Sequence, residues 1–203
     1  MKTTTISFFL LIITTAIASL GFAQDWRLTK QKNGISIYDA ATPNSNFKSI
    51  KVVCTLEGSY DKLVKIIKDV NHHKDWVYHN KEASLLKTVS PVEYYYYTVT
   101  TLPWPATNRD VVVHTTITRD SKEQFLEIHS SGHNGMVEEK TGKVRVNHSK
   151  VEWHVTAPTS KTISIVYTME ADPGGSIPAW LANSFADKGP YETFKKLEEL
   201  LKK

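Results

Sequence analysis

Between Gly34 and Glu170, apolar and polar side chains alternate with period two, and only one segment departs from this spacing for long. The alternation predicts strands at 34–40, 47–58, 84–90, 92–101, 110–119, 124–131, 143–156 and 161–170. Short stretches of turn-forming residues, such as Asn33-Gly34 and Ser90-Pro91, separate them. Closely spaced strands with short connections indicate a meandering antiparallel sheet.

Two segments have helical spacing. In the first, residues 59–70, Ser59 is the expected N-cap and one face carries Leu63, Ile66, Ile67 and Val70. The second follows the Pro-Gly-Gly turn after Asp172, with Ser176 as the expected N-cap and Pro178 in the first turn. Its apolar stripe comprises Ile177, Trp180, Leu181, Phe185, Tyr191, Phe194, Leu197 and Leu201.

This C-terminal helix is expected to kink at Gly189-Pro190 or to be divided in two there, because proline removes a hydrogen bond and clashes with the preceding turn. The fold class is therefore α+β, a curved antiparallel sheet wrapped around a long C-terminal helix. Such a sheet either fills the gap with side chains or leaves an internal cavity for a ligand.

The first residues have the form of a cleaved secretory signal. Lys2 precedes an apolar stretch, and the small residues Gly21 and Ala23 occupy the positions expected before a cleavage site. The alternative is a permanent membrane anchor, but hydroxyl side chains dilute the apolar stretch and no basic cluster follows it. We therefore expect 1–23 to be removed, leaving 24–203 as an exported, soluble domain that is periplasmic or secreted.

Composition narrows the possible functions. A chain of 203 residues, 40% of them hydrophobic, can form one domain with a substantial core. Cys54 is the only cysteine, so no internal disulfide can form. The net charge of +4 is compatible with anionic membrane surfaces but is too small to indicate nucleic-acid binding. No nucleotide or nucleophile motif occurs, and the eight histidines lack metal-ligand spacing. We expect a monomer without cofactor, metal or nucleic acid.

Two motifs resemble the START (StAR-related lipid transfer) domain family. PWPATNRDVV (103–112) is similar to the family's aromatic-proline turn and x-R-D strand, and DPGGSIPAWLANSFADKGPYETFKKL (172–197) to its C-terminal turn and lid helix. The segments GISIY, FKSIKV and GKVRVNHSKVEW also resemble the family, in the same order. The resemblance implies a helix-grip fold, of START or Bet v1-like type, holding a lipid or other hydrophobic small molecule under the C-terminal helix. It also implies a gate, made of the two turns, that opens transiently at a membrane surface.

Arg109 stands at the start of an apolar strand, where an unpaired guanidinium is costly. It either grips a lipid phosphate or carboxylate at the cavity mouth, or forms a salt bridge to Asp110 or another acid that fixes the loop. Adjacent strand residues point to opposite faces, so Asp110 is not its natural partner. Because the motif is shared by relatives that carry different lipids, we favour the loop-fixing role.

The four consecutive tyrosines alternate faces, so either Tyr94 and Tyr96 or Tyr95 and Tyr97 face the interior. There they line a cavity or pack across strands without a ligand, and the same alternatives hold for two later aromatic residues. The candidate ligand contacts are Arg109, Tyr94, Tyr96, Thr115, Trp153, Tyr167, Trp180, Leu181 and Phe185. The candidate gate and membrane-docking residues are Pro103, Trp104, Pro105 and Ile177.

Trp104 is held between two prolines and either docks on a membrane or folds back over the core.

Our main hypothesis is a lipid carrier or sensor, and the alternative is a helix-grip cyclase or hydrolase using Arg109, Tyr96 or His114. No nucleophile–base pair supports the enzyme. A module with a filled core is a third possibility. Thr115 and Ile117 stand where sterol-carrying relatives place a charged residue, and no aromatic cage for choline can be located.

Overall fold

A computed structural model describes residues 24–203 apart from 43, 44, 46, 121, 123, 176 and 178. Within the C-terminal helix, the side chains of 179, 180, 182–184 and 187 also lie outside this description. The expected signal segment, the expected N-cap Ser176, Pro178 and the side chain of Trp180 therefore fall outside the described residues.

The strands form one ten-stranded sheet with the order β1-β2-β3-β10-β9-β7-β6-β5-β4, and β8 pairs with β6 beside this path. All pairs are antiparallel except β6–β8. The bounds are β1 Arg27–Lys32, β2 Ile35–Ala41, β3 Lys48–Glu57, β4 Asn80–Ser90, β5 Glu93–Thr100, β6 Asn108–Arg119, β7 Leu126–Gly132, β8 Lys143–Arg145, β9 His148–Thr159 and β10 Thr162–Asp172. The predicted antiparallel sheet is confirmed.

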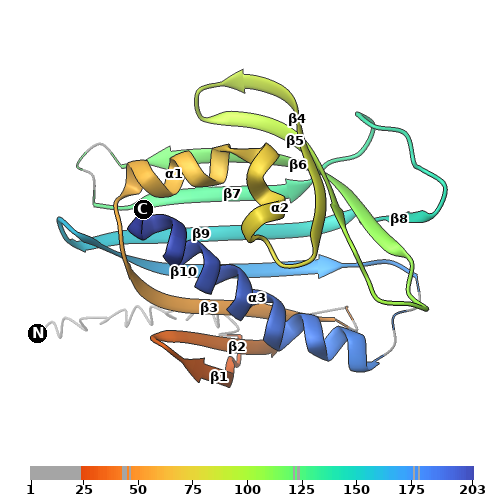
Figure 1. Cartoon of the computed structure of the whole chain (residues 1–203), viewed down its shortest axis with the longest axis horizontal. Helices are drawn as coiled ribbons and strands as arrows, with labels where there is room; N and C mark the ends of the chain where they lie inside the picture. The colour runs from red at the N-terminus through yellow and green to blue at the C-terminus, as the bar shows by residue number, and fades with distance from the viewer. Residues whose placement is uncertain are drawn as a thin grey trace, which may run out of the picture.

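The helices lie together on one side of the sheet, where α3 crosses it and α1 and α2 lie beside α3 (Figure 1). Their bounds are α1 Tyr60–Lys68, the 3-10 turn η1 Val70–His72, α2 His73–Trp76 and α3 Ala179–Lys202. The predicted N-cap of α1 is confirmed, because Ser59 Oγ accepts a hydrogen bond from the backbone N–H of Lys62 at 3.3 Å.

Helix α3 runs unbroken through Pro190, so the expected division at Gly189-Pro190 is wrong. The surrounding packing accounts for this. A Cβ added to Gly189 would lie 3.2 Å from the ring of Tyr78, which shows how closely the segment after α2 packs against this turn. Phe194, on the following turn, is buried in the core. Tertiary contacts on both sides of Pro190 thus keep α3 helical at a position where proline alone would destabilise the helix.

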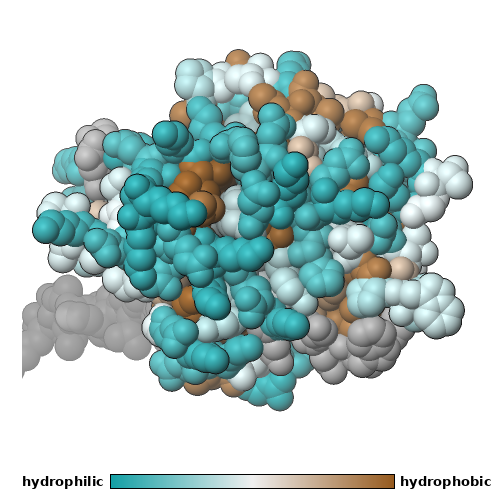
Figure 2. All heavy atoms as spheres, in the orientation of Figure 1, coloured by the Kyte–Doolittle hydropathy of each residue, from teal (hydrophilic) through white to brown (hydrophobic). Residues whose placement is uncertain are grey.

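The core lies between the sheet and helices α1 and α3. Its fully buried side chains include Leu63 of α1 and Leu197 of α3, packed against strand residues such as Ile35, Val52 and Ile165. Burial of this apolar surface, worth about 25 cal/mol per Å², is the main stabilising contribution in a domain without disulfides. The outer side of the helices is largely hydrophilic, whereas apolar side chains reach the surface over the β4–β5 hairpin (Figure 2). The exposed apolar residues of that hairpin are Leu85, Leu86, Val89 and Val92.

Two predicted boundaries differ from the structure. Strand β1, Arg27–Lys32, was not predicted, because RLTKQK has no apolar alternation to reveal an edge strand. The single strand predicted at 143–156 is divided into β8 and β9, because residues 143–145 pair with β6 and the chain enters β9 only at His148. The Val146 N–H donates to the Asp110 carbonyl at 2.8 Å, which extends this parallel contact.

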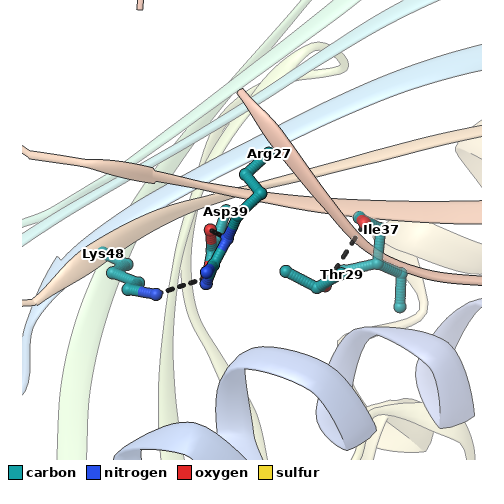
Figure 3. A network of polar contacts seen from close by, with 5 residues as sticks. All are labelled: Arg27, Thr29, Ile37, Asp39 and Lys48. Carbon is teal, nitrogen blue, oxygen red and sulfur yellow. Dashed lines mark hydrogen bonds and ion pairs between the residues drawn. The ribbon is translucent and has the colours of Figure 1, made fainter. Parts of the chain in front are cut away.

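An ionic contact ties the three strands at one end of the sheet (Figure 3). Asp39 of β2 lies between Arg27 of β1, whose Nη2 is 2.9 Å from Oδ2, and Lys48 of β3, whose Nζ bonds the same oxygen. The hydrogen bond from Arg27, reinforced by Lys48, holds the pKa of Asp39 below its usual value despite partial burial. Both cationic side chains remain substantially exposed, so the contact is a modest stabiliser.

Candidate functional site

A cavity of about 470 Å³ lies between the sheet and the helices. Strands β5 and β6 form one wall, β9 and β10 another, and α2 and α3 cover it. Its surface is mainly apolar and aromatic, with Val111 and Val113 on β6 and Leu181, Phe185 and Phe194 on α3. A cavity of this size and character is typical of sites for small hydrophobic ligands.

The candidate ligand contacts converge on this one cavity. Eight of the nine line it: Arg109, Tyr94, Tyr96, Thr115, Trp153, Tyr167, Leu181 and Phe185. The ninth, Trp180, has a side chain outside the described set. Ile177 of the gate set also lines the cavity, whereas Pro103, Trp104 and Pro105 do not.

Trp104 projects into solvent, with 89% of its surface exposed. The alternative in which its ring folds back over the core is therefore wrong. The flanking prolines at 103 and 105 are exposed as well. The turn thus presents an amphipathic ring to the surroundings, as membrane-interface residues do.

The tyrosine run on β5 divides between the two faces of the sheet. Tyr94 and Tyr96 line the cavity, whereas the Tyr97 hydroxyl donates to Asp110 Oδ2 at 3.0 Å on the opposite face. Tyr95 also lies on that face, where its ring stacks on His114 with the centroids 4.3 Å apart. Burial raises the pKa of Tyr94 to about 12 and raises the pKa of Tyr96 further. The cavity phenols therefore remain neutral hydrogen-bond donors.

Arg109 binds backbone carbonyls and no acid. Its Nε donates to Pro173 O at 3.0 Å, its Nη2 to Gly174 O at 2.7 Å and its Nη1 to Thr107 O. In the part of the chain that the structure describes, no carboxylate pairs with it, so the expected acidic partner is wrong. Alternation excludes Asp110, and the turn before α3 offers its carbonyls instead. Burial lowers the pKa of the guanidinium, which nevertheless stays charged.

Asp110 has a separate partner on the opposite face of β6. Arg145 of β8 donates from Nε to Oδ1 at 3.1 Å and from Nη2 to Oδ2 at 2.9 Å, and both side chains are almost fully buried. Burial alone would raise the pKa of Asp110, but the hydrogen bonds from Arg145 and Tyr97 hold it below its usual value. Arg145 also donates to the carbonyls of Val137 and Glu138. From the sequence, alternation indicated only that Asp110 faces away from Arg109. Its partner Arg145 could not be predicted, because it lies in a distant segment of the chain.

Three cavity residues next to α2 were not predicted. His73, Trp76 and Asn80 line the cavity, and His73 Nε2 lies 2.8 Å from Ile67 O. Burial lowers the pKa of His73, so this wall is neutral near pH 7. Trp76 Nε1 and Asn80 Oδ1 are buried without a hydrogen-bond partner. These residues occupy a single helical turn and the start of β4, which is too short a segment for periodicity to identify.

The residues proposed for catalysis do not form a constellation. His114 Nε2 lies 2.8 Å from Glu93 Oε1 on the face away from the cavity, and His114 is not among the cavity-lining residues. Burial raises the pKa of the Cys54 thiol to about 12, which makes it a poor nucleophile. Among the residues whose placement is described, no cluster of His, Cys, Asp or Glu is arranged to hold a metal ion. None of the described helices is long and apolar enough to cross a membrane.

Comparisons with known proteins agree with this geometry. The START domain family model matches residues 21–203. The mouse (Mus musculus) phosphatidylcholine transfer protein is 28% identical over 169 residues, covering 81% of this chain and 78% of its own length. The crystal structure of a STAR-related lipid transfer protein from Xanthomonas axonopodis is 30% identical, has a TM-score of 0.79, and covers 88% of this chain and 99% of its own. The human StAR-related lipid transfer protein 5, at 15% identity and a TM-score of 0.76, shares the fold over 87% of this chain and 86% of its own.

Proposed function

Because this chain belongs to the START domain family, we propose that it binds a lipid in the cavity beneath α3 and transfers it between membranes without changing it chemically. The observation that carries this proposal is the apolar cavity of about 470 Å³ on which the candidate contacts converge. Transfer of a lipid chain from water into such a cavity is favourable by about 25 cal/mol per Å² of apolar surface buried. The names of the relatives, a phosphatidylcholine transfer protein and a STAR-related lipid transfer protein, support lipid as the cargo.

The proposed gate is the pair of turns that Arg109 holds together. Thr107 lies at the base of the Trp104 turn, and Pro173 and Gly174 form the turn that leads to α3. Gly174 and Gly175 both have positive φ angles, of 62° and 59°, which glycine adopts without strain. A hinge at this turn would let α3 move away from the cavity, while the exposed Trp104 ring contacts the membrane.

We also propose that the protein works outside the cytoplasm, as an exported domain released by cleavage after Ala23. The basis is the signal-like composition of the first 23 residues. The mass and N-terminal sequence of protein recovered from the periplasm or medium test this, and Gln24 is the expected first residue. A product that still begins at Met1 and stays with the membrane would contradict it.

Native mass spectrometry of protein purified from its own compartment tests the carrier function. We expect a bound lipid, released on denaturation and identified in the organic extract. Val111→Phe should reduce its occupancy, because this variant places a larger side chain on the cavity wall. Leu85→Phe is the matched control, since Leu85 lies on the exposed hairpin. Protein that is empty in repeated preparations, or a recovered lipid whose mass changes during incubation, would overturn the proposal.

A further inference from the structure

Among the described residues, two of the three tyrosines that line the cavity have hydroxyl groups without a hydrogen-bond partner. Tyr94 donates to Ile67 O at 3.4 Å, so its hydroxyl is satisfied within the protein. Tyr96 and Tyr167 line the same cavity, and neither hydroxyl has a hydrogen-bond partner within the described portion of the chain. In the described part of the chain, the fully buried side-chain atoms that lack a partner are Trp76 Nε1 and Asn80 Oδ1, and neither tyrosine oxygen is among them. Two phenols therefore face the cavity with their donors unused.

The two rings are held in place by aromatic neighbours. Tyr167 makes edge contacts with Trp153 at 4.9 Å and with Phe194 at 5.3 Å between centroids. Tyr96 makes an edge contact with His73 at 5.5 Å. Tyr167 also contributes, after burial and Tyr94, to raising the pKa of Tyr96. Both hydroxyls are thus fixed before any ligand binds, which lowers the entropic cost of using them.

The two phenols and the imidazole that contacts one of them are uncharged. Burial raises the pKa of both tyrosines and lowers that of His73, so all three are neutral near pH 7. Tyr96 lies opposite Val113 on β6, four residues from Arg109, so the Cα atoms of Val113 and Arg109 are about 13 Å apart along the strand. A phosphate or carboxylate at the phenols would be buried beside neutral aromatic rings, at a high desolvation cost.

We propose that Tyr96 and Tyr167 form a subsite for an uncharged carbonyl oxygen of the bound lipid, such as that of an ester, amide or ketone. A carbonyl oxygen has two lone pairs and can accept from both phenols at once. A quaternary ammonium group cannot accept a hydrogen bond, and a hydrocarbon leaves both donors unsatisfied. The inference rests on the proposed function, and it predicts that the cargo places an ester-like group, not its charged end, between these two tyrosines.

A pair of probes differing in one carbonyl tests this subsite. Methyl palmitate and hexadecyl methyl ether have similar chains, but only the ester has a carbonyl oxygen. We expect the wild-type protein to bind the ester about tenfold more tightly, since each hydrogen bond contributes roughly a threefold to tenfold gain. Tyr96→Phe and Tyr167→Phe should each reduce this preference, and the double variant should abolish it. In the wild-type complex, the infrared carbonyl band of the ester should lie at lower frequency than in the double variant.

Tyr95→Phe is the matched control, because Tyr95 lies on the same strand but on the face away from the cavity. It should leave the ester preference unchanged. The cavity variants should not lower the melting temperature, since the hydroxyls of Tyr96 and Tyr167 have no partner among the residues that the structure describes. Equal affinity for ester and ether in the wild type, or a preference that survives the double variant, would overturn the subsite while leaving lipid carriage intact. Tighter binding of palmitate that depends on Arg109 would also overturn it. Failure of every lipid to bind would instead refute the proposed function.

Discussion

Arg109 and Arg145 are both nearly buried beside strand β6, but they lie on its opposite faces and have different partners. Arg145 forms two hydrogen bonds with the carboxylate of Asp110, which neutralises its charge. Arg109 faces the cavity and binds only backbone carbonyls, whose dipoles solvate a cation without neutralising it. Arg145, on the outer face, is thus part of a neutral ion pair, whereas Arg109, on the inner face, keeps a net charge.

The partners also differ in what they connect. Asp110 and Arg145 join two strands of the sheet, β6 and β8, and neither contacts a helix through this ion pair. The carbonyls of Thr107, Pro173 and Gly174 belong to the turns that we propose as the gate. We infer that the outer pair contributes mainly to stability, whereas the inner contacts are suited to be broken and remade.

The largest expected effect follows from breaking the outer pair. Asp110→Asn should lower the free energy of unfolding by about 3–5 kcal/mol, because it leaves the Arg145 guanidinium buried without a counter-ion. Urea denaturation measures this loss. Asp39→Asn is the matched control, since both of its cationic partners are largely exposed, and it should cost about 1 kcal/mol or less.

Acid titration sharpens the same comparison. The pKa of Asp110 is lowered in the folded protein, so its stabilising contribution is present above its unfolded-state value, about 3.9, and is lost as the pH falls through the folded value. The difference in stability between wild type and Asp110→Asn should therefore shrink at low pH. A difference that is constant with pH, or equal losses for Asp39→Asn and Asp110→Asn, would contradict the distinction between the buried and exposed pairs.

A smaller loss is expected on the inner face. Arg109→Met should lower the free energy of unfolding by about 1–2 kcal/mol, because three charged hydrogen bonds are lost but an uncompensated buried charge is removed as well. The turn before α3 should become more susceptible to limited proteolysis, which mass spectrometry of the fragments would locate. Arg109→Lys separates charge from geometry, because an ammonium group cannot reach all three carbonyls in the fork arrangement. A loss as large as that of Asp110→Asn would show that the two arginines are equivalent.

The sequence predicted the parts of the fold that depend on local pattern. Period-two alternation located most strands, and the alternation rule correctly separated Asp110 from Arg109. It missed β1, whose polar edge sequence has no pattern, and it did not exclude a division of α3 at Gly189-Pro190, where tertiary packing keeps the helix continuous.

The candidate site, like the fold, was predictable where it depends on local sequence pattern. Residues on α3 such as Leu181 could be assigned to the interior from periodicity, whereas alternation placed Tyr94 and Tyr96 on one face without showing that this face is the inner one. The carbonyl partners of Arg109 could not be predicted, because a backbone oxygen has no signature in the sequence and becomes a partner only when a turn from a distant segment arrives. The same holds for Trp76 and Asn80, which line the cavity only because α2 folds against β4.

The smallest effect on stability is expected at Trp104, which belongs to the turn whose base Arg109 holds. The ring is 89% exposed, so Trp104→Ala removes almost no packing and should change the free energy of unfolding by less than about 1 kcal/mol. If the ring contacts the membrane while the gate opens, the same variant should slow lipid transfer between liposomes several-fold. Leu28→Ala, which alters another exposed apolar residue on the edge strand β1, is the control and should transfer at the wild-type rate. We expect the two measurements to differ, with lipid transfer slowed and stability unchanged. This result would assign Trp104, like Arg109, to the proposed gate and not to the stable core. An unchanged transfer rate would leave the turn with no role in docking.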